Sequence, residues 1–179
     1  MNLKEACEIK GWQTIPEMEW LAEHASGHNT IVEVGTYYGR SARCILDNSN
    51  AVLYCVDTWN GPVFDDNNKQ IYNVNDYVYA RFLENMKGYI ESKRVVPIKG
   101  TIDKFYQLYH PKKVDMIFID GDHRYFQVKK DIETAKLLIN SGGIICGHDY
   151  HPLWPGVIKA VNEAFPKVNV MHSVWYYYV

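Results

Sequence analysis

Short apolar runs alternate with segments of helical spacing along most of the chain. Five of these runs are rich in β-branched residues, and each is followed by an amphipathic stretch. They cover residues 30–34, 51–56, 94–98, 114–119 and 142–147. Strand-then-helix units in series are typical of a parallel sheet with helices on both faces. The pattern therefore predicts an α/β, Rossmann-like, doubly wound sheet that is mostly parallel.

The two ends of the chain add elements of a different kind. Thr14, Pro16 and Glu17 form a capping box that predicts a helix over 15–25. This helix belongs to an N-terminal helical segment, residues 1–29, that precedes the first strand. Near the C-terminus, VNVM and VWYYY are separated by only two residues. That spacing favours an antiparallel hairpin at one edge of the sheet.

Composition limits the kinds of partner. The 179 residues carry a formal net charge of −2, without a long block of like charge, which argues against a nucleic-acid partner. No apolar run approaches the roughly 20 residues of a membrane span, and the N-terminus has no apolar leader. We expect residues 1–179 to form one soluble, cytoplasmic domain that binds a small molecule. A homo-oligomer stays open, because the aromatic edge VWYYYV could pair with a second copy.

Polar residues collect where the predicted strands end. The five ends carry Glu33, Asp57, Gly100-Thr101, Asp120 to His123, and His148-Asp149. In an open α/β sheet, ligands bind outside the carboxyl ends of the strands. The sequence therefore predicts one site that collects all five groups.

The turn VEVGTYYGRS after the first strand limits which class of ligand the site can bind. It lacks the G-x-G-x-x-G that lets bare backbone approach a pyrophosphate, and two tyrosines fill the space between Gly35 and Gly39. Asp57 follows Gly35 by 22 positions, where a carboxylate can accept hydrogen bonds from a ribose diol. Glu33 could meet an ammonium group. These features favour a nucleoside cofactor without a phosphate.

The ordered motifs resemble those of class I S-adenosylmethionine-dependent methyltransferases. The similarity is to the small O-methyltransferase group that includes catechol O-methyltransferase and the macrocin and cephalosporin-type enzymes. It is carried by VEVGTYYGRS, VDTW, VDMIFIDGDHRY and GGIICGHDY, and it extends over about residues 30–178. The resemblance implies that family's strand order, with the terminal hairpin at the edge.

The resemblance also implies roles for individual residues. Those implied to bind S-adenosyl-L-methionine are Glu33, Gly35, Thr36, Tyr37, Gly39, Ser41, Asp57, Thr58, Gly100, Thr101, Ile102, Asp103 and Asp120. Within this set, Ile102 and Asp103 would lie beside the adenine. Metal ligands are implied at Asp120, His148 and Asp149, where Mg²⁺ would prefer oxygen and an imidazole suits another divalent metal better. His123 stands where the group can place a lysine base, so Asp120 and His123 are the catalytic candidates.

We therefore expect an S-adenosylmethionine-dependent O-methyltransferase acting on a hydroxyl of a small molecule, a sugar or a phenol. Whether a divalent metal assists stays open. A metal-dependent hydrolase using Asp120, Asp122, His123, His148 and Asp149 is the first alternative, although it leaves the glycine turn and Asp57 unexplained. A non-catalytic cofactor-binding protein on the same fold is the second.

Some assignments have a purely structural alternative. Asp122 either caps the next helix or supports catalysis, and His123 either moves a proton or only hydrogen-bonds a neighbour. The acceptor is expected to contact Trp12 and Trp20 near the N-terminus, residues 151–154, and the polar loop 59–75. That loop is either a lid over the site or a surface excursion.

Overall fold

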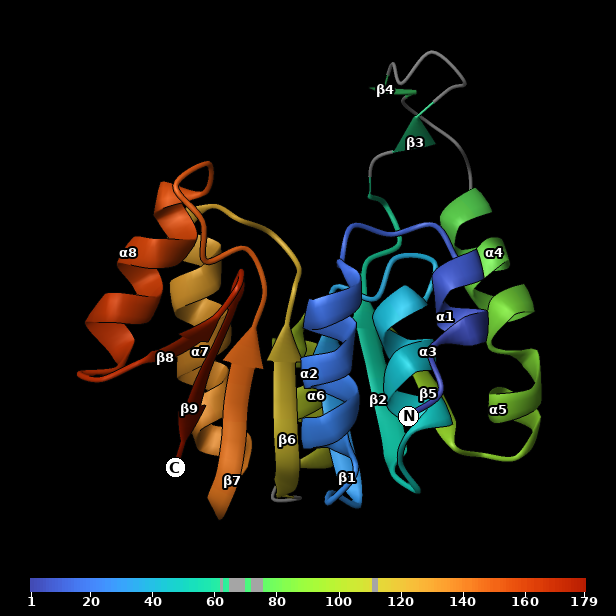
Figure 1. Ribbon diagram of the computed structural model, residues 1–179, viewed down its shortest axis with the longest axis horizontal. Helices are drawn as coiled ribbons and strands as arrows, with labels where there is room; N and C mark the ends of the chain where they lie inside the picture. Colours follow the sequence, from blue (N-terminus) through green and yellow to red (C-terminus); the bar gives the residue numbers. More distant parts are fainter. Residues whose placement is uncertain (62, 65–69, 72–75, 111–112) are drawn as a thin grey trace.

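The computed structural model describes residues 1–61, 63–64, 70–71, 76–110 and 113–179. In this part of the chain a seven-stranded sheet has the order β5-β2-β1-β6-β7-β9-β8 (Figure 1). The strands are β1 Thr30–Val34, β2 Val52–Asp57, β5 Val95–Lys99, β6 Val114–Ile119, β7 Ile139–Gly147, β8 Asn169–Met171 and β9 Val174–Tyr178. The first five of these run parallel, and β9 is antiparallel to both β7 and β8. The predicted sheet and its C-terminal hairpin are confirmed.

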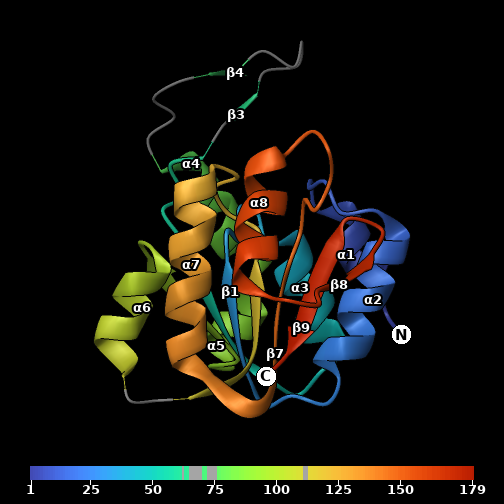
Figure 2. The ribbon, with the colours of Figure 1, turned by 90° about the vertical axis from the view of Figure 1, so that its left-hand side faces the viewer.

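Helices cover both faces of the sheet (Figure 2). They are α1 Lys4–Glu8, α2 Ile15–Ala25, α3 Arg40–Asp47, α4 Tyr77–Asn85, α5 Lys87–Glu91, α6 Ile102–Tyr109, α7 Tyr125–Leu138 and α8 Pro155–Ala164. One core lies between the sheet and α1 to α4, and a second lies between the sheet and α6 to α8. No helix among the described residues is long and apolar enough to cross a membrane.

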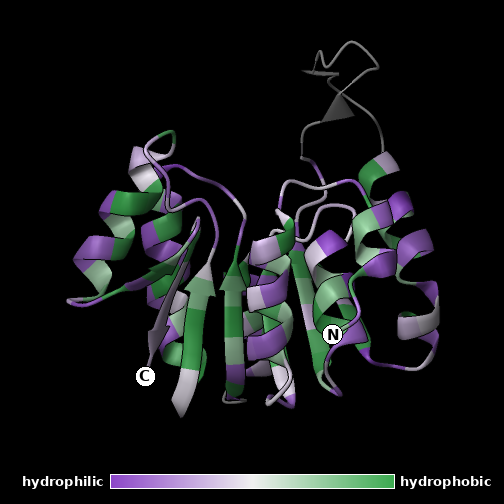
Figure 3. Cartoon of the chain, viewed as in Figure 1, coloured by the Kyte–Doolittle hydropathy of each residue, from purple (hydrophilic) through white to green (hydrophobic). Residues whose placement is uncertain are grey.

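The central strands are apolar because both of their faces are covered. In β6, Met116 and Phe118 belong to the core beneath α2 and α3, whereas Ile117 and Ile119 belong to the core beneath α7 and α8. Figure 3 shows this strand as a nearly continuous hydrophobic ribbon. The run ends where β6 emerges from the sheet at Asp120, so the change from apolar to acidic residues marks the edge of the core.

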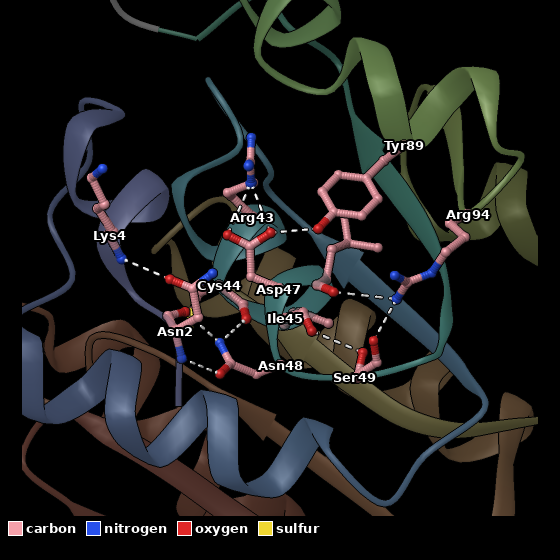
Figure 4. A network of polar contacts seen from close by, with 11 residues as sticks. Asn2, Lys4, Arg43, Cys44, Ile45, Asp47, Asn48, Ser49, Tyr89 and Arg94 are labelled. Carbon is pink, nitrogen blue, oxygen red and sulfur yellow. Dashed lines mark hydrogen bonds and ion pairs between the residues drawn. The ribbon is translucent and has the colours of Figure 1, made fainter.

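The N-terminal segment packs on the sheet through α2 and is fastened to the end of α3 by polar contacts. The predicted α2 begins at Ile15, and the Glu17 carboxylate accepts a hydrogen bond from the backbone N–H of Thr14 at 2.7 Å. Helix α1 is an additional element that the sequence pattern did not predict. Ahead of it, Asn2 and Asn48 exchange hydrogen bonds of 2.6 and 2.7 Å, which fasten the chain start to the end of α3 (Figure 4).

Two predicted segments differ from the structure in detail. The amphipathic stretch that follows the second predicted strand is divided at Met86 into two helices, α4 and α5. The polar loop 59–75, interpreted as either a lid or a surface excursion, lies largely outside the described residues. Its described part includes a short antiparallel pair, β3 Val63–Phe64 and β4 Gln70–Ile71.

Candidate active site

A cavity of about 820 Å³ opens at the carboxyl ends of the parallel strands. The structure brings most of the predicted site residues to its wall. These are Gly35, Thr36, Tyr37, Ser41, Asp57, Thr58, Gly100, Thr101, Asp120, His123, His148 and Asp149. All five strand ends therefore contribute to one site, as the topology requires.

Four predicted cofactor residues lie behind this wall. Glu33 is fully buried, and Gly39 adopts the left-handed backbone that starts α3, with φ +93°. Ile102 is fully buried in the core around α6 and α7. The carboxylate of Asp103 lies 2.5 Å from Lys130 and accepts a hydrogen bond from Thr134. The side chains implied to flank the adenine are thus engaged elsewhere.

The turn between β1 and α3 is shaped by a close approach of two strands. Gly35 has φ +86°, and a Cβ added there would lie 2.1 Å from the backbone oxygen of Asp120. Only glycine fits without moving β6. Tyr37 follows with φ 51°, and its N–H donates to Asp57 Oδ2 at 2.7 Å. Trp59 N–H donates to Asp57 Oδ1, also at 2.7 Å, so backbone donors fix the carboxylate at the cavity wall.

Glu33 stands directly beneath this turn. Its Oε1 accepts a hydrogen bond from the Ser41 hydroxyl, and its buried Oε2 has no partner among the described residues. Burial raises the pKa of Glu33 to about 8, and the negative charges of Asp120 and Asp57 act in the same direction. Glu33 is therefore mostly protonated at neutral pH in the ligand-free protein.

His123 and Asp149 form a hydrogen-bonded pair on the cavity wall. His123 Nε2 lies 2.6 Å from Asp149 Oδ2, and the imidazole stacks on the Trp154 ring with centroids 4.2 Å apart. Burial opposes protonation of His123, but the hydrogen bond and charge of Asp149 outweigh it, so the pKa of His123 is raised. The pKa of Asp149 is lowered, because hydrogen bonds from His123 and His148 outweigh its burial. Asp149 itself has φ 61°, an uncommon backbone for a non-glycine residue.

His148 sits among three carboxylates. Its Nδ1 lies 3.4 Å from Asp149 and 3.7 Å from Asp120, while its Nε2 lies 3.3 Å from Glu17. Burial disfavours the charged imidazole, but these acidic neighbours raise the pKa of His148 to about 9. The protonated ring offers no lone pair, so in this arrangement it acts as a cation that balances acidic groups.

Asp120 is held from the opposite side by the N-terminal segment. Gln13 Nε2 donates to Asp120 Oδ2 at 2.5 Å, while the buried Oε1 of Gln13 has no partner among the described residues. Burial raises the pKa of Asp120 to about 6. Gln13 and Glu17 were missed as site residues, because a lone glutamine carries no pattern and Glu17 was explained by its helix cap.

The most compact group of metal-ligating atoms among the described residues comes from Asp120, His123 and Asp149. One ligand atom from each lies within 4.8 Å of the others. The predicted ligand set had His148 in place of His123. Asp122 is not part of this group, and its carboxylate accepts a hydrogen bond from the backbone N–H of Arg124 at 2.8 Å. It does not cap the next helix, because the N-cap of α7 is Arg124 and that helix start has no side-chain cap hydrogen bond.

Tryptophans stand near the cavity in two different roles. Trp12 and Trp154 line it with exposed fractions of 59% and 41%. Trp20, which was also expected there, is instead buried and stacks on His24. The aromatic surface available to an acceptor is therefore that of Trp12, Tyr37 and Trp154.

Residues 32–150 match a family model described as a methyltransferase domain. The chain belongs to this methyltransferase family. The matched span runs from β1 to the turn after β7, and it includes the glycine turn, Asp57, His123 and Asp149. The segment that supplies Gln13 and Glu17 lies outside it.

Individual proteins are also similar to this chain, either in sequence or in fold. The uncharacterized protein R132 of Acanthamoeba polyphaga mimivirus is 30% identical over 143 residues, which cover 78% of this chain and 61% of that protein. Calicheamicin methyltransferase CalS11 has a TM-score of 0.70 and 17% identity over 90% of this chain and 76% of its own. An O-methyltransferase from Bacillus cereus has a TM-score of 0.67 and 16% identity over 99% and 90%. The structural likenesses show a shared fold.

Proposed function

We propose that this protein is an S-adenosylmethionine-dependent methyltransferase that acts on a hydroxyl group of a small molecule, a sugar or a phenol. The observation behind the proposal is one cavity that combines a phosphate-excluding glycine turn, the ribose-type carboxylate Asp57 and the His123–Asp149 pair. Two structural neighbours support it by their descriptions. The Bacillus cereus enzyme is in complex with S-adenosylhomocysteine, and CalS11 is described as a TDP-rhamnose 3'-O-methyltransferase.

The residues on the wall fit a nucleoside that carries an amino-acid tail. S-adenosylmethionine supplies an electrophilic methyl group when it is bound. Asp57 is held at the end of β2 with lone pairs left for a ribose diol. Ser41 lines the cavity in front of Glu33, so an ammonium group placed there would meet a hydroxyl backed by a carboxyl group. Tyr37 and Tyr38 stack at 4.0 Å, and the bulk of these rings excludes a pyrophosphate.

His123 is the proposed general base. Asp149 binds Nε2, which leaves Nδ1 as the nitrogen that accepts a proton from the acceptor hydroxyl. Asp149 then stabilises the imidazolium, and stacking on Trp154 restricts rotation of the ring. Such a base typically contributes about 10²- to 10⁴-fold to the rate.

A divalent metal fits the same oxygen and nitrogen donors. Asp120, His123 and Asp149 would hold it, and it would lower the pKa of a hydroxyl bound to it. The two routes exclude each other at His123, since a metal-bound nitrogen cannot also take a proton. We favour the base, because His148 already lies within 3.7 Å of both Asp120 and Asp149 and neutralises part of their charge.

Binding of S-adenosylhomocysteine tests the cofactor assignment directly. We expect a saturating concentration to raise the melting temperature of the wild-type protein, because a ligand that binds only the folded state stabilises it. The Asp57→Asn variant should lose most of this rise, whereas Asp76→Asn, at an exposed position, should keep it. No rise in the wild type would favour the hydrolase alternative, which needs no nucleoside pocket.

Methyl transfer then tests the reaction and the metal. Radiolabelled S-adenosylmethionine is offered with catechol or TDP-rhamnose, with EDTA or with Mn²⁺. Turnover that persists in EDTA and is lost in His123→Ala is the expected result. Turnover that requires Mn²⁺ would place the metal route first, and the absence of transfer to any hydroxylated acceptor would contradict O-methylation.

A further inference from the structure

The cavity is also lined by a buried carboxylate, Asp131, which the proposed reaction does not use. Asp131, on α7, is only 3% exposed and belongs to the cavity wall together with Gln127. Gln127 Nε2 donates to Asp131 Oδ1 at 2.8 Å. Among the described residues, no other group donates a hydrogen bond to this carboxylate. The carboxylate therefore keeps unused acceptor capacity at the cavity wall, where a ligand N–H or O–H group can donate to it.

The position of Asp131 on its helix shows which part of the cavity it faces. Residues 127, 131 and 134 follow the i, i+4, i+7 spacing of one helix stripe. Thr134 on this stripe bonds to Asp103 of α6, so the stripe faces α6. Helix α7 lies between α6 and α8 (Figure 2), and Trp154 stands at the start of α8. The stripe with Asp131 thus faces α6, whereas Trp154, on which His123 stacks, stands at the start of α8 on the other side of α7.

The proposed function orders the parts of the cofactor along this wall. The reacting methyl must face His123, and the ribose is assigned to Asp57 at the end of β2. The adenine ring of the cofactor then extends away from the reacting methyl group. It points toward Gly100 and Thr101, at the end of β5 and the start of α6. That region is bounded by the α6-facing stripe of α7.

We propose that Asp131, oriented by Gln127, recognises the exocyclic amine of the cofactor's adenine. This inference rests on the proposed S-adenosylmethionine dependence. The amine carries two N–H donors. A carboxylate accepts a hydrogen bond from such a donor, whereas it repels a carbonyl oxygen. Asp103, the residue that the family resemblance places beside adenine, is already bound by Lys130 and Thr134. We therefore assign recognition of the adenine amine to Asp131 on α7, the neighbouring helix.

Calorimetric titration with two nucleosides tests the assignment. The probes are S-adenosylhomocysteine and S-inosylhomocysteine, in which a carbonyl oxygen replaces the amine. Loss of a hydrogen bond to a charged group predicts at least about tenfold weaker binding of the inosyl compound to the wild type. Asp131→Asn presents an amide that can donate, so this variant should reduce or reverse the preference. Glu133→Gln, on the exposed side of the same helix, is the matched control and should keep the wild-type ratio.

Several outcomes would overturn the inference without touching the proposed function. Equal affinities of the wild type for the two nucleosides would do so, and this measurement needs no variant to fold. An unchanged ratio in Asp131→Asn, with a loss of preference in Asp103→Asn, would return the role to α6. If neither nucleoside binds the wild type, the proposed function fails as well.

Discussion

Replacement of Glu33 by glutamine should stabilise the ligand-free protein, and more strongly as the pH rises. Burial raises the pKa of Glu33 from an ordinary value of 4.5 to about 8. Below pH 4.5 the carboxyl group is protonated in both the folded and the unfolded chain and contributes nothing to the pH dependence. Between these two values the unfolded chain releases a proton that the folded protein retains, so the free energy of unfolding falls with pH.

The size of the effect follows from the separation of the two pKa values. Each pH unit in the window costs about 1.4 kcal/mol, which gives a total of about 5 kcal/mol above pH 8 and about 3 kcal/mol at pH 7. The side-chain amide of the Glu33→Gln variant is neutral at every pH and keeps an acceptor for the Ser41 hydroxyl. The difference in unfolding free energy between Glu33→Gln and wild type should therefore grow by about 3 kcal/mol between pH 5.5 and pH 7.5.

Urea denaturation at both pH values measures this difference, and titration of all other groups cancels in the comparison. Glu91→Gln, at an exposed position on α5, is the control and should show a difference that does not vary with pH. A flat difference for Glu33→Gln would refute the reasoning, because it would mean that Glu33 ionises in the folded protein as readily as in the unfolded chain.

Three further changes probe the same site. Asp149→Asn removes the hydrogen bond and charge that raise the pKa of His123, so that pKa should fall; an unchanged histidine titration by NMR would contradict the assignment. Gly35→Ala should lower the free energy of unfolding by at least about 2 kcal/mol in urea, through overpacking and left-handed backbone, whereas Gly27→Ala has open space around it and should cost under about 0.5 kcal/mol. Gln13→Leu leaves the buried carboxylate at the end of β6 without its amide donor and should cost about 1–3 kcal/mol by the same measurement.

The fold could be predicted because its signals are local. Each parallel strand is covered on both faces, so each appears in the sequence as an apolar run that ends where the strand leaves the core. The place of the site followed from the topology, because the carboxyl ends of parallel strands meet at one edge. His123 and Asp149 lie 26 positions apart in the sequence yet bond at 2.6 Å for this reason. That these two strand ends lie close together could be predicted without information on side-chain packing.

The residues that hold the strand-end side chains in place could not be predicted from topology. Gln13 bonds to Asp120 across 107 positions, and nothing in the N-terminal segment marks it as part of a polar site. The contrast between Asp103 and Asp131 is of the same kind. Both are aspartates on helices that follow parallel strands, and the packing of α6 on α7 decides which one faces Lys130 and which one faces the cavity. Sequence spacing gives the helix, but the rotation of that helix is set by tertiary contacts.

The N-terminal segment outside the family match is built into the polar cluster. Glu17 caps its own helix through Thr14, accepts a hydrogen bond from the backbone N–H of Ser173, and lies 3.3 Å from His148. One buried carboxylate thus connects α2, the terminal hairpin and the end of β7. The charge of Glu17 contributes to the raised pKa of His148, which contacts Asp149, the hydrogen-bond partner of His123. A residue outside the family match, Glu17, therefore helps set the protonation of His148, which lies within that match.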